Sequence, residues 1–181
     1  RQEVVAPGGG AHTTAFDMDL AKDAPILQES RAAAQRVLND NFLLFFTGVT
    51  RQASSILKEQ TSNIKDRISE LREIKQITCQ AKNEIEKGNF DNLGVLIHQS
   101  WELKKRLAGM ISNGHINEIY ESARRAGAIG GKITGAGGGG FLLLYVPYEH
   151  QTKVRTALNG LQELPFRLEA DGTKVIFNYR R

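Results

Sequence analysis

The chain has 181 residues, of which 40% are hydrophobic and 24% charged, and these proportions exclude a wholly disordered protein. The net charge is +4, but between Lys58 and Lys87 the basic residues are interleaved with acidic ones. The sequence therefore shows no basic stripe of the kind that marks a nucleic-acid surface. A single cysteine, Cys79, excludes an intrachain disulfide and a multi-cysteine metal site. No apolar run reaches the ~20 residues of a membrane span. We expect a cytoplasmic protein that binds neither nucleic acid nor a membrane.

The N-terminal region gives few signals. Residues 1 to about 24 contain "APGGGAHTT", which predicts loops, and "ILQESRAAAQRVL" at 26–38 predicts a helix that ends at Asn39 and Asp40. We therefore treat residues 1–40 as an unassigned segment of loop plus helix, and residues 41–181 as one domain. Asp17 and Asp19 in "FDMDL" have no context that would make either a catalytic base.

The middle of the chain predicts one strand followed by helices. "NFLLFFTG" at 41–48 is a compact apolar run typical of a buried strand, and Thr50 is placed to cap the helix that follows. Apolar residues spaced by three and four then predict a long amphipathic helix that Gly88 ends. This long helix spans 63–87. Two further helices are predicted at 90 to about 108 and at 115–126, and Gly127 ends the last of them.

The closing third changes its periodicity. "FLLLYVP" at 141–147 predicts a strand, and residues 148–161 predict an amphipathic helix. "PFRLEADGTKVIFNY" at 165–179 predicts a hairpin around Asp171 and Gly172. Strand, helices, strand, helix and hairpin together indicate an α+β domain with helices packed on an antiparallel sheet.

The stretch "GGKITGAGGGGF", from Gly130 to Phe141, is the most unusual feature. It contains G-x-G-x-x-G, but it precedes a strand and not a helix, which argues against a dinucleotide fingerprint. Phe141 stands where a phosphate loop of the Walker type needs Lys and Ser or Thr. Two interpretations remain: a tight turn between crossing elements, or a nest of backbone amides for an anion, with Lys132 and Thr134 alongside. The length of the run favours the nest.

Three segments resemble the C-terminal half of one enzyme family. "GGKITGAGGGGFLLLYVP", "LLFFTGVTRQASSILKEQ" and "IHQSWELKKRLAGMISNGHINEIYESARRAGAIGGK" are similar to kinases named for galactokinase, homoserine kinase, mevalonate kinase and phosphomevalonate kinase (GHMP kinases), most of all to bacterial heptose 7-phosphate kinases. The resemblance covers roughly 41–181 and implies a ferredoxin-like α+β fold. It also implies transfer of phosphate from ATP, with Mg²⁺, to the anomeric hydroxyl of a heptose 7-phosphate or a related sugar.

The resemblance also implies two groups of site residues, and no catalytic or metal-binding residue. The group near the nucleotide phosphates is Lys132, Thr134, Gly135, Ala136, Gly137, Gly138, Gly139 and Gly140. The group near the sugar is Thr47, Thr50, Arg51, His98, Trp101 and Lys105. Both parts of the second group also have a purely structural interpretation. The residues at 47–51 could form a helix cap with a solvated Arg51. On the helix at 90–108, Trp101 could lie in the core with His98 and Lys105 at the surface.

The ATP loop of the family, Pro-x-x-x-Gly-Leu-Gly-Ser-Ser, and the segment with its acidic catalytic residue are not in this sequence. Together with a start at Arg1, this suggests the C-terminal domain of a kinase, inactive alone, whose partners are ATP and a sugar phosphate. The sequence leaves open whether the chain forms a homodimer. The alternative function is that of a non-catalytic module, either one that binds a sugar phosphate or a regulatory one. A ferredoxin-like nucleic-acid binder would need exposed aromatics on its sheet, whereas these strands are mostly aliphatic.

Overall fold

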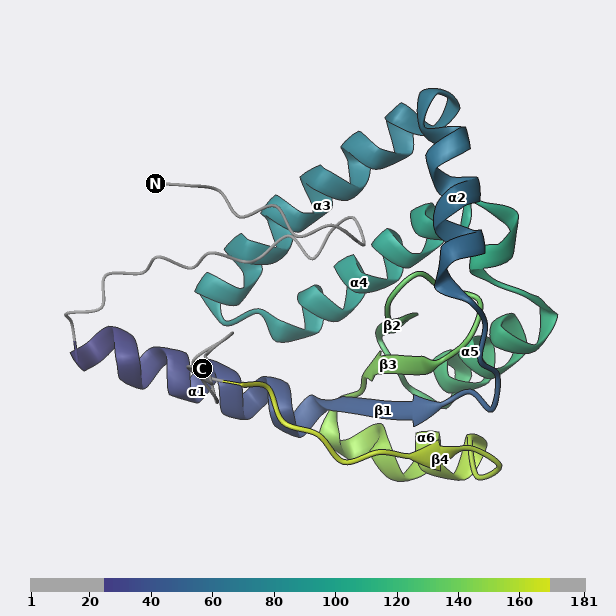
Figure 1. The fold of residues 1–181 in the computed structure, drawn as a ribbon. Helices are drawn as coiled ribbons and strands as arrows, with labels where there is room; N and C mark the ends of the chain where they lie inside the picture. Colours follow the sequence, from purple (N-terminus) through teal and green to yellow (C-terminus); the bar gives the residue numbers. More distant parts are fainter. Residues whose placement is uncertain (1–24, 170–181) are drawn as a thin grey trace, which may run out of the picture.

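The computed structural model describes residues 25–169, so Asp17, Asp19 and the predicted turn at Asp171 lie outside the described residues. Helix α1 (Pro25–Asn41) confirms the predicted helix but continues through Asn39 and Asp40, which were expected to end it. It leads directly into strand β1 (Phe42–Phe46), as Figure 1 shows. The domain boundary at residue 40 stays a prediction.

The sheet is antiparallel and has the strand order β2-β3-β1-β4, which confirms the α+β class. Its strands are β1, β2 (Gly130–Ile133), β3 (Phe141–Tyr145) and β4 (Gln162–Glu163). The prediction missed β2, which lies inside the glycine-rich stretch, and β4. It also placed a strand from residue 165, but residues 164–169 form no strand.

The predicted helices are present with shifted ends. Gly88 and Gly127 end α3 and α5 in the left-handed conformation, with φ of 75° and 118°. Thr50 does not cap α2, because the residue before that helix is Gln52. The predicted long helix begins later than expected, because a 3-10 turn, η1, precedes α3. The bounds are α2 Ala53–Asn63, η1 Ile64–Arg67, α3 Ile68–Lys87, α4 Phe90–Lys105, α5 Gly114–Ala126 and α6 Gln151–Ala157.

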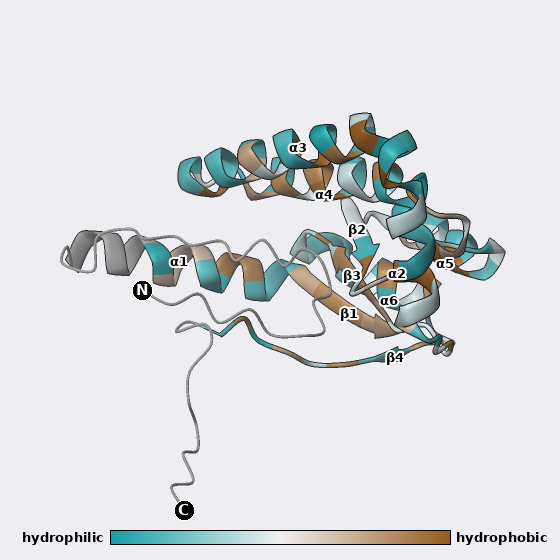
Figure 2. Cartoon of the chain, turned by 45° about the horizontal axis from the view of Figure 1, so that its top comes forward, coloured by the Kyte–Doolittle hydropathy of each residue, from teal (hydrophilic) through white to brown (hydrophobic). Residues whose placement is uncertain are grey.

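The two faces of the sheet have different neighbours. Leu142 and Leu144 of β3 are fully buried in one cluster with Tyr120 of α5 and Val154 of α6. On the other face the Tyr145 hydroxyl donates a 3.1 Å hydrogen bond to Asp91 of α4. Helix α4 packs on β2, and α3 packs along α4 (Figures 1 and 2). In Figure 2, β1 is brown along its length and α3 is mostly teal, as expected of a core strand and an outer helix. No helix within 25–169 is long and apolar enough to cross a membrane.

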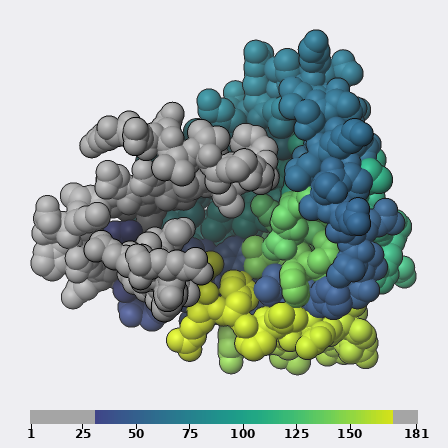
Figure 3. Space-filling model, in the orientation of Figure 1, coloured from purple at the N-terminus to yellow at the C-terminus, as the bar shows by residue number. Residues whose placement is uncertain are grey.

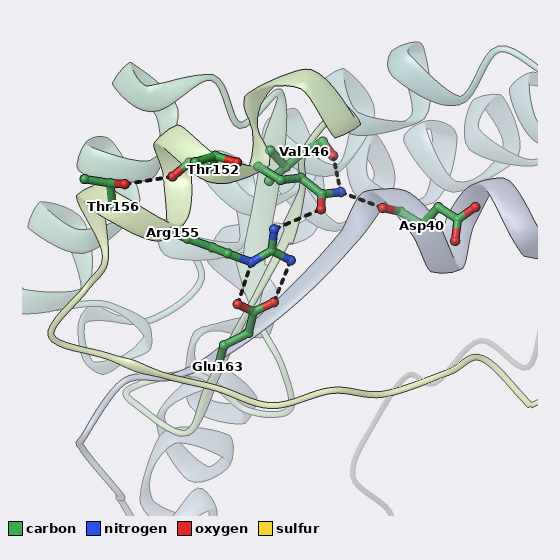
Figure 4. Close-up of polar contacts among 7 residues, drawn as sticks. Asp40, Val146, Thr152, Arg155, Thr156 and Glu163 are labelled. Atoms are coloured by element: carbon green, nitrogen blue, oxygen red, sulfur yellow. Dashed lines mark hydrogen bonds and ion pairs between the residues drawn. The ribbon is translucent and has the colours of Figure 1, made fainter.

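A polar cluster joins α6 to the ends of α1 and β3 (Figure 4). Gln151 is buried, and its Nε2 donates to the carbonyl oxygens of Asp40 at 2.5 Å and Val146 at 3.3 Å. Its Oε1 accepts from Arg155 at 3.2 Å, and Arg155 forms a two-pronged ion pair with Glu163 of β4 at 2.8 and 2.9 Å. One side chain thus satisfies two main-chain carbonyls and orients the arginine that holds the edge strand.

Replacing Gln151 with leucine should lower the free energy of unfolding by about 1–3 kcal/mol, because the buried Val146 carbonyl and the part-buried Asp40 carbonyl lose their donor. Urea unfolding of the 181-residue chain measures this. Thr156→Val is the matched control: it removes an exposed 2.9 Å bond to the Thr152 carbonyl and should change stability by less than about 0.5 kcal/mol. Equal effects of the two substitutions would contradict the role given to Gln151.

Candidate functional site

The glycine-rich loop, residues 134–140, connects β2 to β3. Five of its glycines have positive φ, in the region that other L-residues rarely adopt. Their φ values are 70° for Gly135, 109° for Gly137, 75° for Gly138, 155° for Gly139 and 87° for Gly140. The glycines are therefore needed for one specific backbone path and do not indicate a flexible linker.

The second half of the loop is wedged between two other segments. The Gly138 amide donates to the Ile111 carbonyl and the Gly140 amide to the Val49 carbonyl, both at 2.7 Å. A Cβ on Gly139 would lie 2.5 Å from the Val49 oxygen, and a Cβ on Gly138 would lie 2.6 Å from Cδ1 of Ile56. In Figure 3 green atoms lie directly beside the blue atoms of α2, in keeping with these contacts. A Cβ on Gly137 would likewise lie 2.8 Å from the Ile111 oxygen, whereas one on Gly140 would meet nothing within 4 Å. Close approach thus explains Gly137 to Gly139, and Gly140 is required by its positive φ.

The first half of the loop is less occupied. The amides of Ala136 and Gly137 donate no hydrogen bond to another residue of 25–169, and a Cβ on Gly135 would meet nothing within 4 Å. The packed-turn interpretation therefore describes Gly137 to Gly139. A role of the unpartnered Ala136 and Gly137 amides in binding an anion stays a prediction.

Thr47 joins the end of β1 to the end of the loop. It is 1% exposed, and both its amide and its Oγ1 donate to the Gly140 carbonyl at 2.9 Å. His115, at the start of α5, contacts the Thr47 carbonyl through Nε2 at 3.1 Å. Thr50 and Arg51, which were predicted together with Thr47, are both exposed. Arg51 lies beside the loop, because its Cδ is 3.3 Å from the position that a Cβ on Gly138 would take. Thr47 and Arg51 are thus at the loop.

Substituting valine for Thr47 keeps the shape and removes the hydroxyl. We expect a loss of about 1 kcal/mol in stability, because Oγ1 no longer donates to Gly140 or accepts from the Val49 amide at 3.4 Å, while the Thr47 amide still donates to Gly140. Hydrogen exchange of the Gly140 amide should accelerate more than that of Leu144 in the core of β3. Unchanged exchange at Gly140 would show that the hydroxyl does not hold the loop.

A lysine that the sequence analysis did not select contacts the loop. Lys104 of α4 donates from Nζ to the Gly135 carbonyl at 2.5 Å, whereas the predicted Lys105 is paired with Glu102 at 2.7 Å. The spacing could not have selected it, because Lys104 and Lys105 lie three and four residues after the buried Trp101 and both share its side of the helix.

Lys104 lies close to a second cation. Gly130 faces α4, and Lys132, two residues along β2, points to the same side of the strand. Burial and the positive charge of Lys132 lower the pKa of Lys104 to about 8, and burial also lowers the pKa of Lys132. Neither lysine forms an ion pair with a residue of 25–169. The start of the loop is thus a half-buried region of uncompensated positive charge.

The helix α4 group predicted near the sugar is not at the loop. Trp101 is 1% exposed and packs near Tyr120, so it lies in the core and offers no free face for stacking on a sugar. His98 contacts the Tyr120 hydroxyl at 2.8 Å, and burial lowers the His98 pKa. His98 and Glu102 line a surface cavity with residues of α5, and no loop residue contributes to it. Within the described chain, no cluster of His, Cys, Asp or Glu could hold a metal ion.

Comparison with known proteins identifies the class. Residues 81–163 match the family "GHMP kinases C terminal". D-glycero-alpha-D-manno-heptose 7-phosphate kinase of Campylobacter jejuni is 32% identical over 106 residues, 58% of this chain and 31% of that protein. Mevalonate kinase of Thermococcus gammatolerans is 42% identical over 73 residues, 40% of this chain and 21% of that protein.

The fold is that of the same kinases. The structure of L. major mevalonate kinase in complex with R-mevalonate aligns with 67% of this chain and 40% of its own, at a TM-score of 0.59 and 17% identity. Residues 81–163 therefore form a GHMP kinase C-terminal domain, the class found in sugar and mevalonate-type kinases. It spans about a third or less of the length of the curated relatives it matches first.

Proposed function

We propose that this chain is the C-terminal part of an ATP-dependent sugar kinase that phosphorylates the anomeric hydroxyl of a heptose 7-phosphate. The observation that carries the proposal is the loop at 134–140, fixed between two other segments and bordered by cations without acidic partners. The choice of a heptose rests on the Campylobacter jejuni relative, which is matched over 58% of this chain. A cytoplasmic location belongs to the same proposal, supported by the single, exposed Cys79.

In this proposal the loop positions phosphate groups and balances their charge. Phosphoryl transfer requires mainly positioning and electrostatic stabilisation, and both are tasks for main-chain amides and fixed cations. Lys132, Thr134 and the glycines from Gly135 to Gly140 would border the nucleotide phosphates, with Arg51 beside Gly138. The acidic catalytic residue and the ligands of Mg²⁺ would come from a preceding ATP-loop domain.

Only some of the residues predicted near the sugar keep a direct role in this proposal. Arg51 remains a residue that would face the substrate, because it is exposed and beside the loop. Thr47 would act through the loop it holds, since its side chain is buried. His98 and Lys105 would border a sugar only if the substrate extends toward α5.

The experiment compares acceptors with the complete polypeptide that carries this chain, supplied with labelled ATP and Mg²⁺. Transfer of label to D-glycero-D-manno-heptose 7-phosphate but not to mevalonate would support the proposal. Transfer to mevalonate alone would assign the chain to the other branch of the family, consistent with the 42% identical segment. Calorimetry separates the alternative: sugar-phosphate binding with no transfer by the complete polypeptide would indicate a non-catalytic module.

A further inference from the structure

Three cationic side chains surround the glycine loop. Lys104 approaches from α4 and contacts the Gly135 carbonyl, Lys132 lies in β2 just before the loop, and Arg51 lies beside Gly138. Among residues 25–169 none of these three forms an ion pair. The neighbouring Lys105 of α4, by contrast, is paired with Glu102.

We infer that Lys104 and Lys132 form an anion site at the start of the glycine loop, and that its ligand is a phosphate dianion carried by one of the two substrates. Lys104 is assigned no role by the family motifs noted above, and Lys105 beside it is engaged elsewhere. The inference rests on the proposed function for the choice of phosphate. The anion site itself rests on the geometry.

The donors exceed the acceptors here. An ammonium group has three N–H donors, and Lys104 uses one of them on the Gly135 carbonyl, whereas Lys132 has no hydrogen bond within the described part of the chain. The amides of Ala136 and Gly137 are also free of partners there. A doubly charged oxyanion can accept several such bonds at once, which a neutral ligand cannot match.

The surrounding charges favour an anion as well. Lys132 repels Lys104 across the interface of β2 and α4, and an anion between them would remove that repulsion. Two acidic side chains of the adjoining helices have other partners. Glu59 of α2 accepts from the Gly109 amide at 2.8 Å, and Glu102 of α4 is paired with Lys105. No carboxylate among the described residues contributes to the shifted pKa of Lys104.

The test is titration of the 181-residue chain with sulfate, which stays a dianion between pH 7 and 9 and therefore reports on the lysines alone. NMR shifts of the Gly135 and Ala136 amides follow binding. We expect saturable binding at pH 7 that weakens by at least about tenfold at pH 9, because Lys104 loses its proton as the pH passes its pKa of about 8. Lys104→Met and Lys132→Met should each weaken binding at least about tenfold.

Lys105→Met is the matched control, since it removes a neighbouring lysine that is paired with Glu102. It should leave sulfate affinity within about twofold. Absence of saturable binding in the unchanged chain, or an equal loss in the control, would overturn the site. If a methionine variant does not fold, carbon-detected titration of the unchanged chain decides: bound sulfate should raise the pKa of Lys104, and an unchanged pKa would refute the inference.

Two further titrations identify the source of the phosphate. Glucose 6-phosphate represents a sugar phosphate, and a non-hydrolysable ATP analogue represents the nucleotide. If one of these two ligands binds the unchanged chain but not Lys104→Met, the phosphate at the site comes from that class of substrate. If neither ligand shifts the Gly135 amide signal, the site does not bind a phosphate. If sulfate binds as expected but the complete polypeptide phosphorylates no sugar, the anion site stands and the proposed kinase function fails.

Discussion

Replacing Gly130 with alanine should lower the free energy of unfolding by about 3 kcal/mol or more, the largest effect expected of a single methyl group in this chain. A Cβ at Gly130 would overlap the carbonyl oxygen of Gly94 and lie 2.9 Å from the Gly94 carbonyl carbon. Both are main-chain atoms of α4, so no side chain can rotate away. Helix α4 would have to move away from β2, and Lys104 would move with it.

Urea unfolding of the 181-residue chain measures this prediction, and Gly114→Ala is its control. A Cβ on Gly114 would meet nothing within 4 Å, and its φ is not positive. That variant should stay within about 0.5 kcal/mol of the unchanged chain. A Gly130→Ala chain that unfolds at the same urea concentration as the control would show that α4 is not held this closely on β2.

The second large effect is expected on activity. Gly139→Ala should reduce phosphoryl transfer by the complete polypeptide at least about 100-fold, because a Cβ there would lie 2.5 Å from the Val49 oxygen, at a φ of 155°. The loop would have to shift, and misplacing a positioning element by about 1 Å costs on the order of 100-fold in rate. The loss should appear in kcat with the overall fold intact.

Gly135→Ala separates backbone strain from steric overlap. It has a φ of 70°, but a Cβ there would meet nothing within 4 Å, so it should cost only about 1 kcal/mol of conformational strain. We expect an activity loss of less than about tenfold. Equal losses for Gly135→Ala and Gly139→Ala would mean that conformation alone, and not the contact with the segment after β1, sets the position of the loop.

The sequence predicted the elements whose periodicity is strong. The long helix of α3 has apolar residues at spacings of three and four, and β1 and β3 are compact apolar runs, so hydrophobic pattern alone located them. Strand β2 was missed because "GGKI" begins with two glycines, which are disfavoured in strands and are present here for the close approach of α4. Strand β4 has two polar residues and no pattern to recognise.

The glycine loop and two residues beside it could be picked out from the sequence, and their role as a site stays a prediction. The loop could be found because its glycines are contiguous in the sequence, and Thr47 and Arg51 because they follow an apolar strand. Lys104 was missed in favour of Lys105 because one residue rotates a helix position by about 100°, and only packing decides which lysine turns inward. Trp101 was predicted both ways, and its burial in the core supports the structural alternative.

The most direct test of the whole account is one transfer assay with the complete polypeptide, in which labelled ATP is offered with D-glycero-D-manno-heptose 7-phosphate and the product is analysed by phosphorus NMR. We expect a second phosphate on the anomeric oxygen, formed by the unchanged protein at a rate that Gly139→Ala reduces at least about 100-fold. A protein that transfers phosphate equally well with and without that substitution, or transfers none to any sugar phosphate, would contradict it.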